Sequence, residues 1–336
     1  MTVDLTALQS VPRLLFAIAL APLQGQRFQP TGFPGLGAAT FRSPAGDGLL
    51  VESAQSVANW LERTVWDEAR SDVVEDALGI SHVRVQRPDG SFLTDTILEA
   101  HRLNSPYLLE TKDKRFLERL RNELGGLETG PVDRKTLAQV LLKLDVGSLL
   151  HGVFIAKKEL AGGRLRLARA LSAFVEADGV RIAASGGVKN DHVNPSGDTK
   201  AGFGNVPFAR DEFTAERITL YVNLDLAQIR GYGLGDEATD LLTLLALYKL
   251  RRLVDAPLRL RTACDLMPAG DGVKATSPAG FELPGRAVLG AALRAAIDKC
   301  AGMMEVTTAT FGDKLEAVEE KAPVDGADDD SEDPAA

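Results

Sequence analysis

Residues 185–210 read SGGVKNDHVNPSGDTKAGFGNVPFAR and separate two segments with the pattern of β-strands, Ala168–Ala177 and Arg217–Asp225. Inside a compact domain, loops longer than about 12–15 residues are uncommon and are usually functional or disordered. Apolar residues, which a solvated linker has little reason to carry, lie near the end of this excursion: Phe203, Val206 and Phe208. We therefore expect the excursion to be a functional element whose apolar side chains are covered by a partner.

The segments around the excursion predict an α+β fold. Arg13–Ala21 is a continuous apolar run typical of a central strand, and apolar residues recur at helical spacing after the N-cap candidate Ser53. The expected core elements, in chain order, are strand Arg13–Ala21, helix Ser53–Val65, strands His151–Lys157, Ala168–Ala177 and Arg217–Asp225, helix Asp236–Leu253 and strand Leu258–Leu266. This order approximates a β-α-β-β-α-β unit, the ferredoxin-like or RNA-recognition-motif arrangement.

Residues 80–145 are predicted to be an insertion into this unit. HVRVQRPDGSFL has the pattern of a hairpin with Asp89-Gly90 at its turn. Helices are expected over Lys114–Leu124 and Pro131–Leu144. We expect one domain with large insertions rather than two average domains, although a chain of 336 residues allows either.

The composition is that of a soluble globular protein, with 45% hydrophobic and 25% charged residues. The longest apolar run is too short to cross a bilayer and lacks the flanks of a signal peptide, so we expect a cytoplasmic protein. The two cysteines, Cys264 and Cys300, are too few for a disulfide scaffold or a cysteine-rich metal site. We expect two core thiols and no metal or other cofactor.

The net charge of −9 is concentrated at the C-terminus. Residues 316–336 contain nine acidic residues and one lysine, which leaves the rest of the chain almost neutral. Such a segment has almost nothing to bury and is predicted to be a disordered tail. Two roles are open: the tail solubilises the protein, or it competes with nucleic acid for the basic surface of the body.

Eight segments, in order, resemble the backbone subunits of type I CRISPR surveillance complexes, in the RAMP superfamily, and most of all their subtype I-G (formerly I-U) version. The resemblance covers most of the chain. The segments are RFQPTGFPGLG at 27–37, LLVESAQSVANWLE at 49–62, HRLNSPYLLE at 101–110, GSLLHGVFIA at 147–156, RALSAFVEA at 169–177, GGVKNDHVNPS at 186–196, GFGNVPFARDEFTAE at 202–216 and YVNLDLAQIRGYGL at 221–234.

This resemblance implies a Cas-seven-type, non-catalytic scaffold that polymerises head-to-tail along a CRISPR guide RNA (crRNA) in Cascade and serves antiviral defence. It implies a single RAMP domain over residues 1–315, an RNA-recognition-like palm whose insertions are helical fingers over about 80–147 and a thumb loop over about 185–212. The implied partners are crRNA, target DNA through guide pairing, further copies of the chain, the large, guide-processing and end-capping subunits, and a recruited helicase-nuclease.

A scaffold for variable guides must bind the RNA backbone and leave the base edges free. Helix N-termini bind anions, so we expect a phosphate seat at the start of the first helix: Ser53, Gln55, Ser56 and Asn59. For Ser53, a role as helix N-cap alone is equally open. In the preceding loop the RNA-binding candidates are Arg27, Gln29 and Thr31, unless this segment is only a tight connection.

Within the thumb, four polar residues are candidates for phosphate contacts: Lys189, Asn190, His192 and Lys200. Phe203, Val206 and Phe208 either enter between successive bases as a wedge or pack on the next protomer, because aromatic residues are common in interface cores. Arg102 and Arg169 are further RNA candidates, or structural arginines whose stems cover the sheet.

Two other functions are compatible with the sequence. A RAMP-type endoribonuclease that processes guide precursor or cuts target RNA would take a general base from His101, His151 or His192. Asp191 or Asp198 would polarise a water or bind a metal. These histidines lie far apart in the sequence and show no metal-binding spacing. A free-standing single-stranded RNA-binding protein is also open, but the nearly neutral body lacks the broad basic field expected of one.

Overall fold

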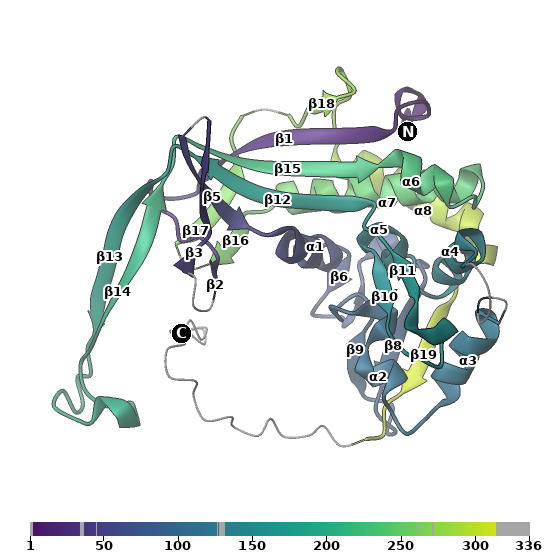
Figure 1. Ribbon diagram of the computed structural model, residues 1–336, viewed down its shortest axis with the longest axis horizontal. Coiled ribbons are helices and arrows are strands. Elements are labelled where there is room, and N and C mark those ends of the chain that lie inside the picture. Colours follow the sequence, from purple (N-terminus) through teal and green to yellow (C-terminus); the bar gives the residue numbers. More distant parts are fainter. Residues whose placement is uncertain are drawn as a thin grey trace.

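The computed structural model describes residues 3–313 except 34–36, 45, 126, 128–131, 262 and 271. The acidic segment 316–336 and the first residue of the predicted helix Pro131–Leu144 therefore lie outside the described residues. A curled antiparallel sheet combines with several helices, which confirms the predicted α+β class (Figure 1). Within the described ranges, no helix has both the length and the apolar character needed to cross a bilayer.

The main sheet is antiparallel throughout. In spatial order its strands are β16 (Leu258–Arg261), β17 (Cys264–Pro268), β1 (Arg13–Pro22), β15 (Arg217–Asp225), β12 (Leu171–Asp178), β5 (Gly46–Glu52) and β4 (Thr40–Ser43), with β18 (Ala275–Ser277) pairing beside β1. The register runs from Arg13 opposite Asp225 to Leu20 opposite Ile218. Sequence-distant strands thus meet at the centre of the sheet.

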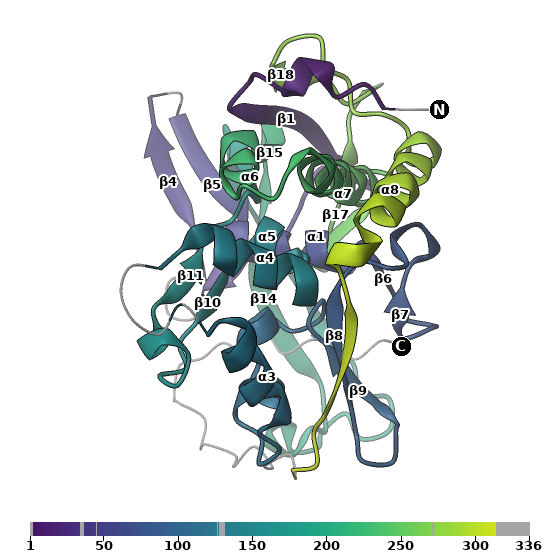
Figure 2. The ribbon, with the colours of Figure 1, turned by 90° about the vertical axis from the view of Figure 1, so that its right-hand side faces the viewer.

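Two long helices, α7 (Asp236–Val254) and α8 (Arg286–Cys300), lie against the inner face of the curled sheet (Figure 2). Helix α1 (Ala54–Arg63) packs on β12, whose side chains alternate between buried and half-buried. Helix α7 is buried on almost every side, as expected for a helix that is apolar around its circumference. Helix α8 packs along α7, and α6 (Leu226–Gly231) follows β15 directly.

A second lobe lies at one end of the sheet. Its elements are β6 (Trp66–Asp67), β7 (Asp72–Val73), β8 (His82–Gln86), β9 (Phe92–Asp95), α2 (Pro106–Leu109), α3 (Arg115–Glu123), α4 (Arg134–Leu144), α5 (Gly147–His151), β10 (Val153–Ile155), β11 (Leu165–Leu167) and β19 (Val306–Thr310). The predicted hairpin around Asp89-Gly90 is confirmed as β8 and β9. The sequence gives no hint that β19 returns from the C-terminal part of the chain to pair in parallel with β8.

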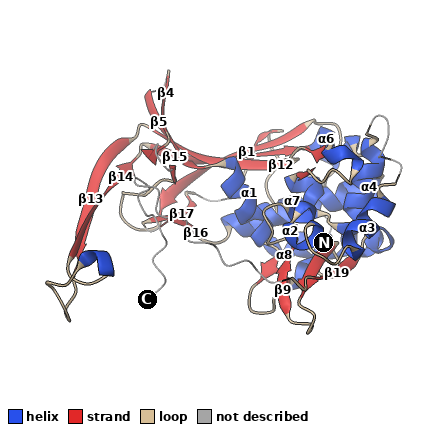
Figure 3. Ribbon diagram, turned by 60° about the horizontal axis from the view of Figure 1, so that its bottom comes forward, coloured by secondary structure: helices blue, strands red, loops and turns tan. Residues whose placement is uncertain are grey.

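The excursion at 185–210 is not an irregular loop but the outer part of a long two-stranded ribbon (Figure 3). Strands β13 (Arg181–Lys189) and β14 (Val206–Thr214) pair continuously from Arg181 opposite Thr214 to Lys189 opposite Val206. The ribbon leaves the sheet near β4 and β5 and projects away from it, so that it faces the second lobe across an arch (Figure 1). Its strands were missed because, beyond Glu212 and Phe213 at its buried base, neither side of the ribbon packs on a core that would impose an apolar alternation.

Three other boundaries differ from the predictions. His151 ends α5, so the predicted strand His151–Lys157 shrinks to β10, which pairs only with β11. The predicted last strand Leu258–Leu266 is a hairpin of β16 and β17, with Ala263 in the left-handed conformation at the turn. Loop residues 24–37 contain the short strand β2 (Gly32–Phe33), which pairs with β3 (Gly37–Ala38).

Candidate nucleic-acid interface

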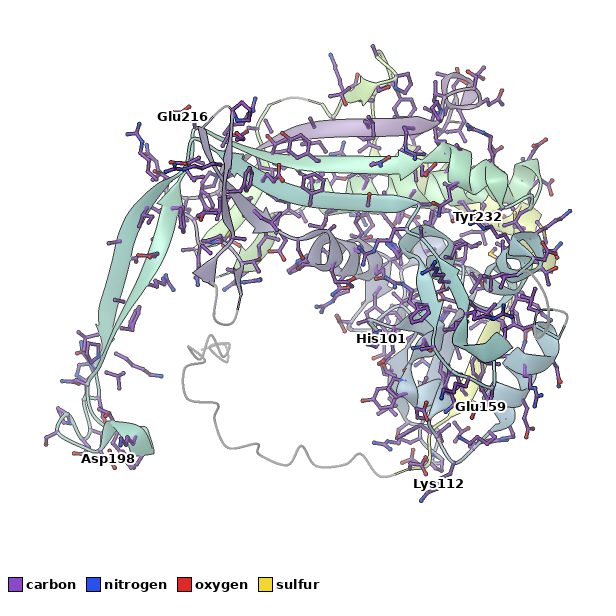
Figure 4. The ribbon with its side chains drawn as sticks, in the orientation of Figure 1. His101, Lys112, Glu159, Asp198, Glu216 and Tyr232 are labelled. Carbon is purple, nitrogen blue, oxygen red and sulfur yellow. The ribbon has the colours of Figure 1, made fainter. Side chains whose placement is uncertain are left out.

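A basic cleft of about 1010 Å³ lies between the end of the sheet and the second lobe. It opens where β1 begins and β15 ends, and the β10–β11 hairpin and the start of α4 form its other walls. His101 and Tyr232, which both line it, mark its two sides in Figure 4. The basic side chains of the lining are Arg13, His101, Arg102, Arg134, His151, Arg166 and Arg169. Asp225 is the one carboxylate among these lining residues.

The positive charge of the cleft is only partly neutralised. Arg13 forms an ion pair with Asp225, its cross-strand neighbour. Arg134 and Arg166 are exposed, and within the described part of the chain neither has an ion-pair or hydrogen-bond partner for its guanidinium. Two guanidinium groups at the rim are therefore free to contact an anion.

Two predicted RNA-binding residues, Gln55 on α1 and Arg169, meet at this cleft, and Asn59 lies one turn further along α1. Gln55 donates to Asn59 Oδ1 over 3.1 Å, and Gln55 Oε1 accepts a hydrogen bond from the Arg169 guanidinium. Burial, followed by repulsion from Arg102, lowers the pKa of Arg169 below its usual value. The exposed amides and this arginine form a connected polar strip along the cleft edge.

Ser53 and Ser56 lie at the first turn of the same helix. The Ser53 hydroxyl accepts a hydrogen bond from the Ser56 N–H over 3.2 Å, which makes Ser53 the N-cap. Its oxygen satisfies one of the otherwise unpaired helix N–H groups. The capping alternative thus describes the present role of Ser53, while both residues keep a half-exposed surface.

Arg102 lines the cleft, but its guanidinium group is already paired with a buried carboxylate. The residue is 5% exposed, and its Nε and Nη2 atoms each lie 2.5 Å from a carboxylate oxygen of Glu62. Its backbone is left-handed, with φ of 50°. This geometry is that of a structural arginine, because Nε and Nη2, a pair of guanidinium nitrogens that could contact a phosphate in parallel, already donate to Glu62.

Beneath the cleft lies a cluster of buried charged groups: Glu62, Arg102, Asp145, His151 and Lys249. Lys249 Nζ lies 2.9 Å from His151 Nε2. Burial lowers the pKa of Lys249 to about 8, and burial followed by nearby cations holds the pKa of His151 well below 6.5. Burial also raises the pKa of Glu62 and Asp145 above their usual values. A neutral His151 that accepts from the lysine ammonium fits these directions.

The loop that carries Arg27, Gln29 and Thr31 is held against the end of β5, just before α1. Thr31 Oγ1 donates to Glu52 Oε2 over 2.9 Å and accepts from Arg261 over 2.9 Å. Arg27 lies 3.5 Å from Glu212, which is buried at the base of the ribbon. Gln29 is half-buried, with its N–H donating to the carbonyl of Ala263. Arg27 and Thr31 are thus engaged by carboxylates that the sequence did not indicate.

The ribbon carries apolar and cationic side chains on one face. Val206, Phe208 and Arg210 alternate along β14 and therefore share a face with Lys189, which lies opposite Val206. Phe208 is 50% exposed and Val206 37%. A Cβ atom at Gly187 would lie 3.2 Å from Cζ of Phe208, so the glycine leaves room for the ring to lie across the ribbon.

The tip of the ribbon is ordered by its two aspartates. Asp191 accepts hydrogen bonds from the N–H groups of Val193, Asn194 and Gly204, which lower its pKa. Asp198 accepts from the N–H of Lys200 over 3.0 Å. The other predicted thumb residues are exposed here: Asn190, His192, Lys200 and Phe203. Both carboxylates are therefore used to shape the turn.

Comparison with known proteins gives the family of this chain. The profile of the family described as CRISPR-associated protein GSU0053 (Cas_GSU0053) matches residues 14–182. The chain belongs to this CRISPR-associated family. No curated protein matches it. A chain of a solved structure titled "CRISPR RNA-guided surveillance complex, pre-nicking" has a TM-score of 0.40 and 15% sequence identity, covering 76% of this chain and 75% of that chain.

The predicted site residues of this CRISPR-associated protein thus fall into three groups. Gln55, Arg102 and Arg169 line the cleft, and Ser53, Ser56 and Asn59 lie at or beyond the first turn of the helix that carries Gln55. The loop residues lie at the base of the ribbon, and the thumb residues lie along its outer half. Reasoning from the sequence missed three arginines of the cleft: Arg13, Arg134 and Arg166. No local pattern distinguishes them from other surface arginines, since their common position depends on the tertiary fold.

Two buried histidines of this CRISPR-associated protein differ in their electrostatics. His82 Nδ1 lies 2.6 Å from Asp95 Oδ2. Burial opposes the charged imidazole, but this hydrogen bond and the attraction of Asp95 outweigh it and raise the pKa of His82 above 6.5. His151, by contrast, is held neutral beside Lys249. The contributions of the two residues to the free energy of unfolding should therefore depend on pH in opposite ways.

The stabilisation from His82 is full below about pH 6.5 and is lost as the pH rises through its raised pKa in the folded state. That from His151 is full above about pH 6.5 and is lost as the pH falls below this value. We expect the loss of stability caused by His82→Gln to become smaller as the pH is raised from about 5.5 to 8. The loss caused by His151→Gln should become smaller as the pH is lowered from about 7.5 to 5. Urea denaturation across this range measures both, and parallel profiles for the two variants would contradict the assignment.

Proposed function

We propose that this chain is a non-catalytic backbone subunit of a type I CRISPR Cascade complex, in the RAMP superfamily and of subtype I-G (formerly I-U). Copies of the chain bind one crRNA and associate head-to-tail along it. Contacts between identical subunits that do not close into a ring produce an open helical filament. The guide is thereby displayed for pairing with invading DNA.

The observation that carries this proposal is the ribbon that projects from the sheet of this CRISPR-associated chain. The ribbon exposes Phe208 and Val206 beside Lys189. An isolated monomer gains nothing from exposing these apolar side chains on a projecting arm. A wedge between bases, with a cation for the adjoining phosphate, uses both kinds of residue. Unstacking costs about a few kcal/mol per step, which contacts to flanking nucleotides and to the adjacent copy must offset.

The basic cleft supports backbone-directed RNA binding. Arg134, Arg166 and Arg169 present guanidinium groups, and Gln55 and Asn59 present amides, none of which requires a particular base. Guanidinium groups suit phosphate oxygens because their fork matches the phosphate geometry. Contacts of this kind fix the RNA and carry no sequence information.

The strand order supports an RNA-recognition-like palm. When β1, β12, β15 and β17 are numbered as strands 1 to 4, their spatial order is 4-1-3-2, and α1 and α7 form the two crossovers. In this assignment the second lobe supplies the fingers and the β13–β14 ribbon the thumb. Further strands at both edges, β4, β5 and β16, extend the unit.

The arrangement of the titratable groups supports a scaffold rather than a nuclease. His101 lies on the second lobe, whereas Asp198 lies at the ribbon tip on the far side of the arch (Figure 4). His151 is buried against Lys249, and Asp191 and Asp198 accept backbone hydrogen bonds. Among the described residues, no cluster of three or more histidine, cysteine or acidic side chains could hold a metal ion.

Co-expression with a CRISPR array and the companion subunits tests this function. We expect the affinity-purified chain to carry CRISPR-derived RNA of uniform length, in a particle that contains several copies and the large and guide-processing subunits. The proposal also expects intact labelled guide precursor and target RNA after incubation with the purified chain. Recovery of a monomer with heterogeneous cellular RNA, or cleavage that is lost in His192→Ala, would contradict it.

A further inference from the structure

We propose that the chain's own acidic segment, residues 316–333, occupies the basic cleft when no RNA is bound. The inference rests on the proposed function in one respect: the segment and RNA compete for the same arginines. It assigns the cleft a second, intramolecular ligand of stated chemistry, a polycarboxylate peptide. RNA binding then requires release of this peptide.

Charge complementarity is the first argument. The segment carries nine carboxylates and one lysine: Glu316, Glu319, Glu320, Asp325, Asp328, Asp329, Asp330, Glu332, Asp333 and Lys321. The cleft presents five arginines and one carboxylate, and Arg134 and Arg166 have no guanidinium partner within the described chain. Carboxylates, like phosphates, pair with guanidinium groups through two parallel hydrogen bonds. The same rim therefore suits both ligands.

The second argument is reach. Asp313, at the end of the described chain, is fixed to the second lobe because its carboxylate accepts from the N–H of Lys112 over 2.7 Å. His101 in the cleft lining precedes Lys112 by eleven residues, so the two lie at most about 40 Å apart. The fifteen residues from Asp313 to Asp328 span up to about 54 Å when extended. The acidic run that begins at Asp328 can therefore reach the cleft.

The third argument is an unpaired donor in the cleft wall. His151 is 1% exposed, and its Nδ1 atom has no hydrogen-bond partner in the described structure. Because Nε2 accepts from Lys249, Nδ1 carries the proton of the neutral ring. Buried donors without partners are rare and call for an acceptor. Because His151 is among the residues that line the cleft, an anionic oxygen bound there is the acceptor that we assign to it.

A weak contact suffices for this role because the segment is tethered. Short flexible tethers give effective concentrations of about 1 mM. A segment that binds the cleft with an intrinsic Kd of about 0.1 mM would therefore lower the affinity for a short RNA by about tenfold. A long guide that engages several copies would displace it by avidity, whereas a stray short RNA would not.

The test uses the full-length chain with the nine carboxylates changed to the corresponding amides. Affinity for an eight-nucleotide single-stranded RNA of mixed sequence is measured at about 50 mM salt, where surface charges are weakly screened. We expect this neutral-tail variant to bind about tenfold more tightly than wild type. A labelled peptide of residues 316–336, added in trans to the same variant, should bind and should be displaced by the RNA.

Matched cleft variants locate the contact. In the neutral-tail background, Arg134→Gln with Arg166→Gln should weaken peptide binding at least about fivefold, since two exposed guanidinium–carboxylate contacts are lost. The control pair, Arg70→Gln with Arg286→Gln, removes the same charge from exposed arginines outside the cleft lining and should leave peptide binding unchanged.

Three results overturn the inference: measurable RNA binding with equal affinity for wild type and neutral-tail variant, failure of the peptide to bind, or peptide binding that is weakened equally by both arginine pairs. Failure of the proposed function gives a different pattern. In that case neither protein binds RNA, yet the peptide still binds and still depends on Arg134 and Arg166, which supports the intramolecular contact.

Discussion

Replacement of Arg102 with alanine should lower the free energy of unfolding by about 3–5 kcal/mol, because it leaves Glu62 as an uncompensated buried charge. Glu62 is 4% exposed, and Arg102 contacts both of its carboxylate oxygens at 2.5 Å. Within the same buried cluster, Lys249 attracts the Glu62 carboxylate and offsets part of the loss, whereas Asp145 repels it. Urea denaturation followed by circular dichroism at pH 7 measures the loss.

The exposed cleft residue Arg166 provides the control. Arg166→Ala should change stability by no more than about 0.5 kcal/mol, as is usual at surface positions. The double variant Arg102→Met with Glu62→Met should recover much of the loss, because it removes both buried charges together. If Arg102→Ala unfolded at the same urea midpoint as wild type, the Arg102–Glu62 ion pair would not be what stabilises the fold beneath the cleft.

Phe208→Ala should weaken guide binding by roughly 5- to 150-fold for each protomer that inserts the ring, since stacking of a base on an aromatic side chain contributes about 1–3 kcal/mol. The fold should survive, because the ring is 50% exposed on the projecting ribbon. Binding of the assembled subunits to guide RNA, measured by fluorescence anisotropy, gives the loss. A guide with 2-aminopurine at successive positions reports directly which base is unstacked.

Two matched variants separate stacking from packing on the next protomer. Phe208→Leu keeps an apolar side chain, so it should restore binding if the ring only packs against protein and should fail to restore it if the ring stacks on a base. Ile182→Ala changes a residue that is 66% exposed on the opposite face of the same ribbon and should leave guide binding unaltered. Equal losses for Phe208→Ala and Ile182→Ala would exclude a wedge on the Phe208 face.

The central fold followed from local patterns where side chains face a core. The run Arg13–Ala21 and the alternating segment Arg217–Asp225 predicted two strands, β1 and β15, which the structure places side by side. The ribbon strands could not be found in the same way because Val188, Phe208 and their neighbours face solvent on both sides. Pairing of β19 with β8 joins segments more than 200 residues apart, and no local pattern records such a contact.

The candidate site was predicted in part for the same reason. Gln55 and Arg169 were selected separately and meet through a hydrogen bond at the cleft. Arg134 and Arg166 were not selected, because an isolated arginine in a sequence gives no sign of the surface that it will share. The partners of Arg27 and Thr31, Glu212 and Glu52, likewise became visible only when the loop was placed against the ribbon base.

The most direct test of the account is the mass of the complex as a function of guide length. The chain is co-expressed with its companion subunits and with arrays whose spacers differ by defined numbers of nucleotides, and native mass spectrometry gives the copy number. Backbone binding by successive identical protomers predicts that copies are added in whole numbers, at a fixed nucleotide increment, as the guide is lengthened. A copy number of one, or a number independent of guide length, would contradict it.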